Sequence, residues 1–178
     1  MTTSSKKILI VIGHPKSDSF CHALAKSFTQ GAKENNNNQI KIIDLYKEKF
    51  NPVYDLKEDA PDVLKYQEMV TESDIITFVY PTWWFRAPAI IEGWIDRVMT
   101  TPYAYTFKKF KITETEIVER FVGNFGRPIG KLTDKKAIII QTYGSPQFAT
   151  KLWFFNLPKL FKFLIKFSNL KYPYIDHD

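Results

Sequence analysis

Unbroken apolar runs alternate along the chain with stretches in which apolar residues recur every three or four positions. The runs are KKILIVIG, QIKIIDL, SDIITFVY and KKAIIIQTY, and their content of β-branched residues is typical of strands that are buried on both faces. A helical pattern follows the first run from Ser19. Its apolar stripe consists of Phe20, Ala23, Leu24, Phe28 and Ala32. Alternating strands and helices predict an α/β fold with a doubly wound parallel sheet.

Further helices are predicted downstream. One covers about residues 61–70, and the clearest starts at Pro88 with Glu92 early and Arg97 late, as the helix dipole favours. A fourth helix is expected over Leu152–Phe167. The segment NLKYPYI after it is a possible fifth strand.

We expect a single domain over residues 1–178. An irregular excursion, at about 101–132, interrupts the alternation of strands and helices without the length of a second domain.

Composition narrows the class of protein. The first residues, MTTSSKK, are polar, and no apolar run approaches the roughly 18 residues of a spanning helix, so we expect a soluble, cytoplasmic protein. A single cysteine predicts neither a disulfide nor a structural metal site. The net charge of +6 suits anionic small molecules, phosphates especially. The basic segment LPKLFKFLIKF is compatible with nucleic acid or a membrane surface, but an amphipathic helix with a solvated face is the favoured interpretation.

Three loops follow the carboxyl ends of predicted strands, where open parallel sheets bind ligands. They are GHPKSDSF, PTWWFRAP and QTYGSP. The first places His14 and Ser19 at a helix start, where free backbone N–H groups favour a phosphate. It lacks both GxGxxG and GxxxxGK[ST]. Ser19 as a plain helix cap and His14 as a strand-end filler remain the alternative.

The second loop carries Trp83, Trp84 and Phe85 between two prolines. Large aromatic rings in a connection suggest a wall for a planar heterocycle. The alternative for Trp83 is packing under the helix or against a second copy of the chain.

These residues together resemble a known family. The segments GHPKSDSFCHALAKSF, DLYKEKFNPVYD, YPTWWFRAPAIIEGWIDRVMTTPYAYTF and GKLTDKKAIIIQTYGSP are similar to those of the flavodoxin-like NAD(P)H:quinone oxidoreductases, over roughly residues 6 to 170. The resemblance implies a five-stranded flavodoxin-like sheet with helices on both faces. Members of that family continue into a last helix that this sequence lacks.

The resemblance also implies an activity and its cofactor. It suggests a homodimeric flavoenzyme that passes a hydride from NAD(P)H, through bound FMN or possibly FAD, to a quinone or azo acceptor. FMN is favoured because only one loop suits a phosphate. No nucleic acid is expected as a partner.

Site residues carry over from the family by position. The residues implied for the flavin phosphate are His14, Ser19, Phe20 and Cys21. Those implied along the isoalloxazine are Pro81, Thr82, Trp84 and Phe85, and those at its pyrimidine edge are Thr142, Tyr143 and Gly144. The tyrosine and histidine that assist the reduced flavin in long eukaryotic members have no match in GSPQFATKLWFF, so no catalytic acid or base is named.

Two other functions remain open. A one-electron flavodoxin-type carrier is disfavoured by the positive charge, because such carriers are acidic. A flavodoxin-like ancillary subunit of a membrane transporter stays possible because of the basic helix near Lys159–Lys166.

Overall fold

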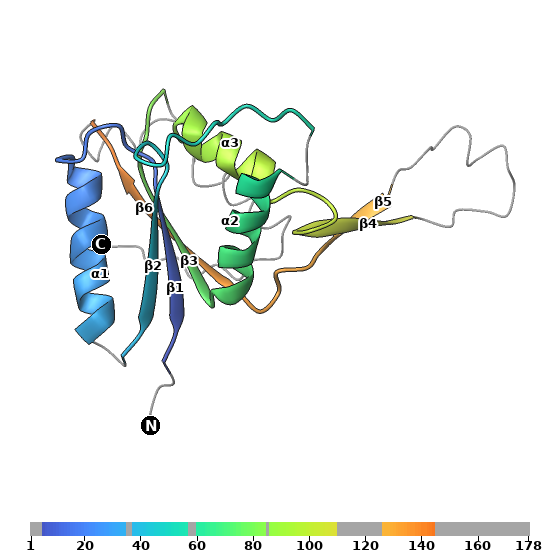
Figure 1. Cartoon of the computed structure of the whole chain (residues 1–178), viewed down its shortest axis with the longest axis horizontal. Coiled ribbons are helices and arrows are strands. Elements are labelled where there is room, and N and C mark those ends of the chain that lie inside the picture. Colours follow the sequence, from blue (N-terminus) through green and yellow to red (C-terminus); the bar gives the residue numbers. More distant parts are fainter. Residues whose placement is uncertain (1–4, 35–36, 57–59, 85, 110–125, 145–178) are drawn as a thin grey trace, which may run out of the picture.

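The computed structural model describes residues 5–34, 37–56, 60–84, 86–109 and 126–144. Its centre is a four-stranded sheet in the order β2-β1-β3-β6 (Figure 1). All neighbouring strands in it run parallel. The strands are β1 (Lys7–Ile12), β2 (Gln39–Asp44), β3 (Ile75–Pro81) and β6 (Lys136–Thr142). The predicted doubly wound α/β class is confirmed for these strands, whereas the expected fifth strand and the helix at Leu152–Phe167 lie outside the described residues.

The two faces of the sheet are covered by different helices (Figure 1). Helix α1 (Phe20–Glu34) lies on one face, and α2 (Pro61–Glu72) and α3 (Ala89–Val98) lie on the other. Successive residues of β1 point to opposite sides. Ile8, Ile10 and Ile12 join one buried cluster, and Leu9 and Val11 join the other. This explains why the strand is an unbroken apolar run.

The buried stripe of α1 differs from the predicted one. Cys21 and Ala25 are buried, and Phe28 and Ala32 are partly buried against the same cluster. Phe20 is 69% exposed and Ala23 is exposed as well. The predicted stripe is thus confirmed at Phe28 and Ala32, whereas in the first turns the buried positions are shifted by one residue, to Cys21 and Ala25. The apolar ring of Phe20 is therefore left at the open end of the helix.

Aromatic rings fill the larger cluster. Trp94 of α3 is fully buried, with its ring centroid 5.7 Å from Phe78 and 6.1 Å from Tyr66 of α2. Edge-on contacts at these distances are favourable for aromatic pairs. The helix predicted after Pro88 thus contributes its buried side chains to the core of this half of the molecule.

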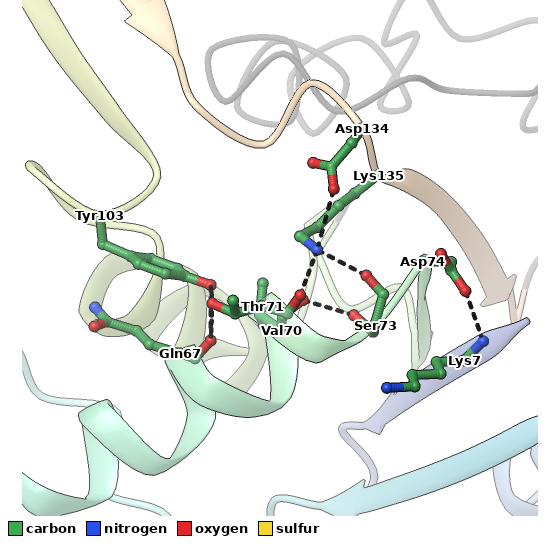
Figure 2. Close-up of polar contacts among 9 residues, drawn as sticks. All are labelled: Lys7, Gln67, Val70, Thr71, Ser73, Asp74, Tyr103, Asp134 and Lys135. Atoms are coloured by element: carbon green, nitrogen blue, oxygen red, sulfur yellow. Dashed lines mark hydrogen bonds and ion pairs between the residues drawn. The ribbon is translucent and has the colours of Figure 1, made fainter.

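A buried lysine joins β6 to the carboxyl end of α2 at the amino edge of the sheet (Figure 2). Lys135 is 5% exposed and donates to the carbonyl oxygens of Thr71, at 2.7 Å, and Ser73, at 2.8 Å. Helix carboxyl ends present carbonyls that lack partners and carry partial negative charge, which a cation satisfies. In the same corner, the Tyr103 hydroxyl donates to the Gln67 carbonyl at 2.8 Å. This edge is closed by structural bonds, so ligand chemistry belongs at the opposite edge.

Part of the expected irregular excursion is ordered. Strands β4 (Tyr105–Lys109) and β5 (Gly126–Gly130) form an antiparallel pair that extends away from the main sheet (Figure 1). The rings of Tyr105 and Phe107 lie 5.5 Å apart, edge to face. Across all the described ranges, none of the helices combines the length and the apolar character needed to cross a membrane.

Candidate functional site

The carboxyl ends of the strands meet at one edge, and backbone bonds tie their loops together. The Gly13 N–H donates to the Val79 carbonyl at 3.0 Å, which joins the loop after β1 to β3. The Thr82 N–H donates to the Thr142 carbonyl at 2.8 Å, which joins the loop after β3 to the end of β6. Strand order reverses at β1 and β3, because β2 lies on one side of β1 and β6 on the far side of β3. Such a reversal opens a crevice between the two loops.

The loop after β1 holds His14 in a defined orientation. The Lys16 N–H donates to His14 Nδ1 at 3.1 Å, so Nδ1 is an acceptor and the ring proton of the neutral imidazole is on Nε2. The ring centroid of His14 lies 6.1 Å from that of Trp83 in the aromatic loop. The two predicted halves of the site are therefore adjacent, with an imidazole N–H donor beside an indole ring.

Ser19 begins a chain of three side chains. Its Oγ lies 2.8 Å from His22 Nδ1. On the other side of the ring, His22 Nε2 lies 3.0 Å from Asp44 Oδ2 at the end of β2. The His22 backbone N–H also points at Ser19 Oγ, at 3.4 Å. Ser19 is thus a helix cap, as the alternative held, and it is also hydrogen-bonded to the His22 side chain, a contact that the cap does not require.

Cys21 connects α1 with β6. Its Sγ lies 3.3 Å from Thr142 Oγ1, which joins two residues implied for opposite ends of the flavin site. Burial raises the pKa of the Cys21 thiol, and the bond to Thr142 lowers it by a smaller amount. The side chain is 1% exposed, so only the backbone N–H of Cys21 can serve a ligand at the helix start.

The aromatic loop is a tight hairpin. Trp83 and Arg86 exchange backbone hydrogen bonds of 3.0 and 2.9 Å, which leaves Trp84 at the tip. Two-residue hairpin turns of the favoured types need a positive φ at their first central residue, and Trp84 has a φ of 48°. This conformation is costly for a bulky side chain. The Trp84 ring is 92% exposed.

The helix after this loop is firmly anchored. Arg86 forms a fork with Glu92 in the first turn of α3, at 3.1 and 2.8 Å. A Cβ added to Gly93 would lie 2.7 Å from the Pro52 Cα, so no other residue fits against that backbone. The start of the segment YPTWWFRAPAIIEGWIDRVMTTPYAYTF, which is part of the family resemblance, therefore has two parts: a loop that faces the site and a helix that holds this loop in place.

Arg97 is the deepest of these anchors. Its guanidinium bonds Asp62 of α2 at 2.8 and 3.0 Å and the Asn51 carbonyl at 2.7 Å. It also lies 5.1 Å from the centre of the Phe50 ring. Arg97 is thus a structural residue rather than a ligand-binding one.

Features of this edge of the sheet suit a flat ring with a phosphate. Thr82 Oγ1, in the first residue after β3, is buried and has no hydrogen-bond partner within the described part of the chain. A buried hydroxyl without a partner is costly and points to a missing polar group. Large rings are exposed on the elements that converge here: Phe20, Trp83, Trp84 and Tyr143. The donors of the α1 start, the Thr82 hydroxyl and these rings fit a phosphorylated planar heterocycle.

Most of the implied site residues come together. Cys21, Thr82 and Thr142 are linked by the contacts above. Ser19 and His14 are joined through His22, whose ring centroid lies 6.3 Å from that of His14. Tyr143 donates to Gln141 Oε1 at 2.6 Å, which fixes it over the end of β6. Pro81 is the last residue of β3, paired with Thr142, and Gly144 follows two residues later in the sequence with open space around its Cα. Phe85 lies outside the described residues.

Two residues of the site were not predicted. His22 stands one helical turn after Ser19, and Asp44 ends the second apolar run. Nothing in the sequence next to either residue indicates a role at the site, and only the sheet order β2-β1 brings the two together. A histidine three residues after a cap serine is the signal that was available. In the described ranges, no three His, Cys, Asp or Glu side chains are grouped so as to hold a metal ion.

Comparisons with known proteins point to one family. A family model described as a flavodoxin-like fold matches residues 6–156. An uncharacterized NAD(P)H oxidoreductase of Haemophilus influenzae is 36% identical over 106 residues, which are 54% of this chain and 52% of that protein. NAD(P)H dehydrogenase (quinone) 1 of Cavia porcellus is 28% identical over 127 residues, 57% of this chain and 46% of that protein. The chain spans about half the length of these curated relatives.

A solved structure agrees over nearly the whole chain. The protein Smu.1420 of Streptococcus mutans has a TM-score of 0.75 and 29% sequence identity, over 95% of this chain and 86% of that one.

Proposed function

Since the chain belongs to the flavodoxin-like fold family, we propose that it is a flavin-dependent NAD(P)H oxidoreductase with FMN as its cofactor and a quinone or azo compound as acceptor. The single observation that carries this proposal is the contact between the phosphate-suited loop and the aromatic loop, through His14 and Trp83. Similarity to NAD(P)H oxidoreductases and a quinone dehydrogenase supports the reaction class. An FMN-dependent NADH-azoreductase of Bacillus anthracis, solved with FMN, shares the fold, with a TM-score of 0.65 and 20% identity over 94% of this chain and 84% of that one.

The proposed roles divide between the loops. Backbone N–H groups at the start of α1, with His14 and Ser19, would hold the phosphate. Thr82 would donate its buried hydroxyl to the polar rim of the ring system, and the aromatic residues would wall its faces. The remaining implied contacts are Phe20, Cys21, Pro81, Trp84, Phe85, Thr142, Tyr143 and Gly144.

The bound flavin would accept a hydride from NAD(P)H and deliver it to the acceptor. The protein's part is to orient the ring, to exclude water and to leave one face open. No described side chain is assigned as an acid or base. We also propose that the protein is a cytoplasmic homodimer of single-domain chains, in which a second copy covers exposed rings such as Trp83.

The basic test is loading the full chain with FMN and following its spectrum. A yellow protein that bleaches with NAD(P)H and recovers its colour with a quinone is the expected result. A chain that cannot be loaded with FMN would instead support the ancillary-subunit function, whose basic helix lies outside the described residues. Reduction by one-electron donors without any reaction with NAD(P)H would support the carrier function.

Two matched variants test the location of the site. Thr77 and Thr82 both carry a buried hydroxyl without a partner in the described residues, but Thr77 lies in the middle of β3. Replacing either with valine removes an unsatisfied hydroxyl, so each variant should stabilise the flavin-free chain, by about 1 kcal/mol. Only Thr82→Val should weaken FMN binding, by up to about tenfold, because only Thr82 loses a bond to the ligand. Equal FMN affinity in the two variants would contradict the proposed placement.

A further inference from the structure

Ser19, His22 and Asp44 form a hydrogen-bonded series, and the acceptor character of the carboxylate determines where its hydrogens lie. Asp44 Oδ2 can only accept, so the hydrogen at the 3.0 Å contact belongs to His22 Nε2. In a neutral imidazole, Nδ1 is then the acceptor, and the Ser19 hydroxyl must donate to it across 2.8 Å. The Ser19 hydroxyl has one hydrogen, which is therefore not available to a ligand.

Protonation of His22 reverses this bond. Imidazolium Nδ1 carries a hydrogen and donates to Ser19 Oγ, which frees the hydroxyl hydrogen to point at an anion beyond the start of α1. Neutral His22 thus presents serine lone pairs to a phosphate, and charged His22 presents a donor. In both states Asp44 Oδ2 accepts from His22 Nε2, so the ring keeps its place while the hydrogen at Nδ1 changes.

We propose that His22, held by Asp44, is a positioning residue that couples binding of the flavin phosphate to the uptake of one proton from solvent. This inference rests on the proposed function, because it concerns how the chain would receive the phosphate of FMN. The proton goes to His22 Nδ1, and the Ser19 hydroxyl turns to donate to a phosphate oxygen. No covalent bond changes.

The surroundings of His22 leave few other candidates for this proton. The His14 ring stands edge-on to it, with centroids 6.3 Å apart, and is the only other imidazole at this edge among the described residues. From β2, Asp44 is the charged group in contact, and its second oxygen accepts from the Lys47 backbone N–H at 3.1 Å. On α1, the neighbouring Cys21 is buried against Thr142. Ser–His–Asp chains also occur in hydrolases, but there Nε2 faces the serine, whereas here Nδ1 does.

The test is the pH dependence of FMN binding by the full chain above about pH 7, where the phosphate monoester, with a second pKa of about 6, is already a dianion. The complex holds one more proton than the free chain, so FMN affinity should be highest at the lower pH and fall as pH rises, by up to about tenfold per unit. Calorimetry in buffers of different ionisation enthalpy measures the uptake directly. Binding of riboflavin, which lacks the phosphate, should take up no proton.

Three variants assign the proton. His22→Asn places an amide near Nδ1 that can donate to Ser19 at every pH, so proton uptake and the pH slope should disappear. Asp44→Asn keeps the acceptor for the Lys47 N–H but removes the charge, so uptake should shrink. His14→Asn should weaken FMN binding and leave the pH slope unchanged.

The outcomes separate this inference from the proposed function. If FMN affinity depends equally on pH in the wild type and in His22→Asn, the inference is overturned while flavin binding stands. The same conclusion follows if the pH dependence is lost only in His14→Asn. If His22→Asn does not fold, the Asp44→Asn result decides, and an undiminished uptake there overturns the inference. Failure of the wild type to bind FMN would overturn both.

Discussion

The ion pair between Arg97 and Asp62 should respond unequally to removal of its two members. The Arg97 side chain is 6% exposed, whereas that of Asp62 is 44% exposed. A charge left behind without its partner is costly in proportion to its isolation from water. Asp62→Ala strands a buried guanidinium with one carbonyl acceptor, Asn51, in addition to the Phe50 ring. Arg97→Met strands a carboxylate that can be hydrated.

The magnitudes follow from these exposures. Breaking a buried pair by removing one partner costs about 3–5 kcal/mol, and this range applies to Asp62→Ala, where the buried cation remains. For Arg97→Met we expect about 1–3 kcal/mol, because Asp62 regains water and the methionine keeps the apolar contact with Phe50. The double variant should resemble Arg97→Met alone, since the stranded cation is then absent.

Urea unfolding at neutral pH measures these differences. With an m-value of about 2 kcal/mol/M, the midpoint should fall by about 1.5–2.5 M for Asp62→Ala and by about 0.5–1.5 M for Arg97→Met. Lys41→Met is a suitable control, because Lys41 pairs with Glu72 on the surface, with side chains 58% and 44% exposed, and its loss should leave the midpoint nearly unchanged. An Arg97→Met variant as unstable as Asp62→Ala would refute the argument from exposure.

Two other predictions concern the site itself. Trp84→Gly should raise the stability of the flavin-free chain by about 1 kcal/mol, because glycine adopts the positive φ of this hairpin without strain, and should weaken FMN binding; thermal unfolding with and without FMN checks both, and a destabilised flavin-free chain would contradict the strain argument. Cys21 should react slowly with iodoacetamide at pH 8 in the folded chain and rapidly in urea, because burial raises the pKa of its thiol; equal rates would mean that the thiol is accessible.

The fold was predictable to the extent that local patterns reflect burial. Strands β1 and β3 appear in the sequence as apolar runs because both of their faces are covered. The edge strand β2 is an exception, because its Ile42 is 49% exposed although the run QIKIIDL predicts burial on both faces. The face of α1 was predicted correctly at Phe28 and Ala32 and wrongly at its start, because Phe20 counts as a core residue in any periodicity, yet it lies at the open end of the helix and is exposed. The pair β4 and β5 was missed because GRPIG has too few apolar residues to resemble a strand.

The site was predictable only where single loops carry it. The rule that ligands bind at strand ends, together with the family resemblance, identified residues in all three loops, and the contacts of His14 and Cys21 bring those loops together. The role of His22 depends on Asp44, which is 22 residues away and reaches it only because β2 lies beside β1. Likewise, Arg97 and Asp62 are 35 residues apart, and nothing in either local segment indicates the pair.

A few residues of chain separate the loop that is proposed to face the ligand from the helix that stabilises this half of the molecule. Trp84 combines an unfavourable backbone conformation with an almost fully exposed ring, which are two features that destabilise a folded chain. Beginning at Ala89, α3 supplies the opposite: a fully buried Trp94, a glycine fitted against Pro52 and the Arg97 fork. A strained loop persists only where its surroundings over-determine it. The buried helix therefore provides the rigidity that holds the exposed Trp84 ring in place beside the proposed flavin site.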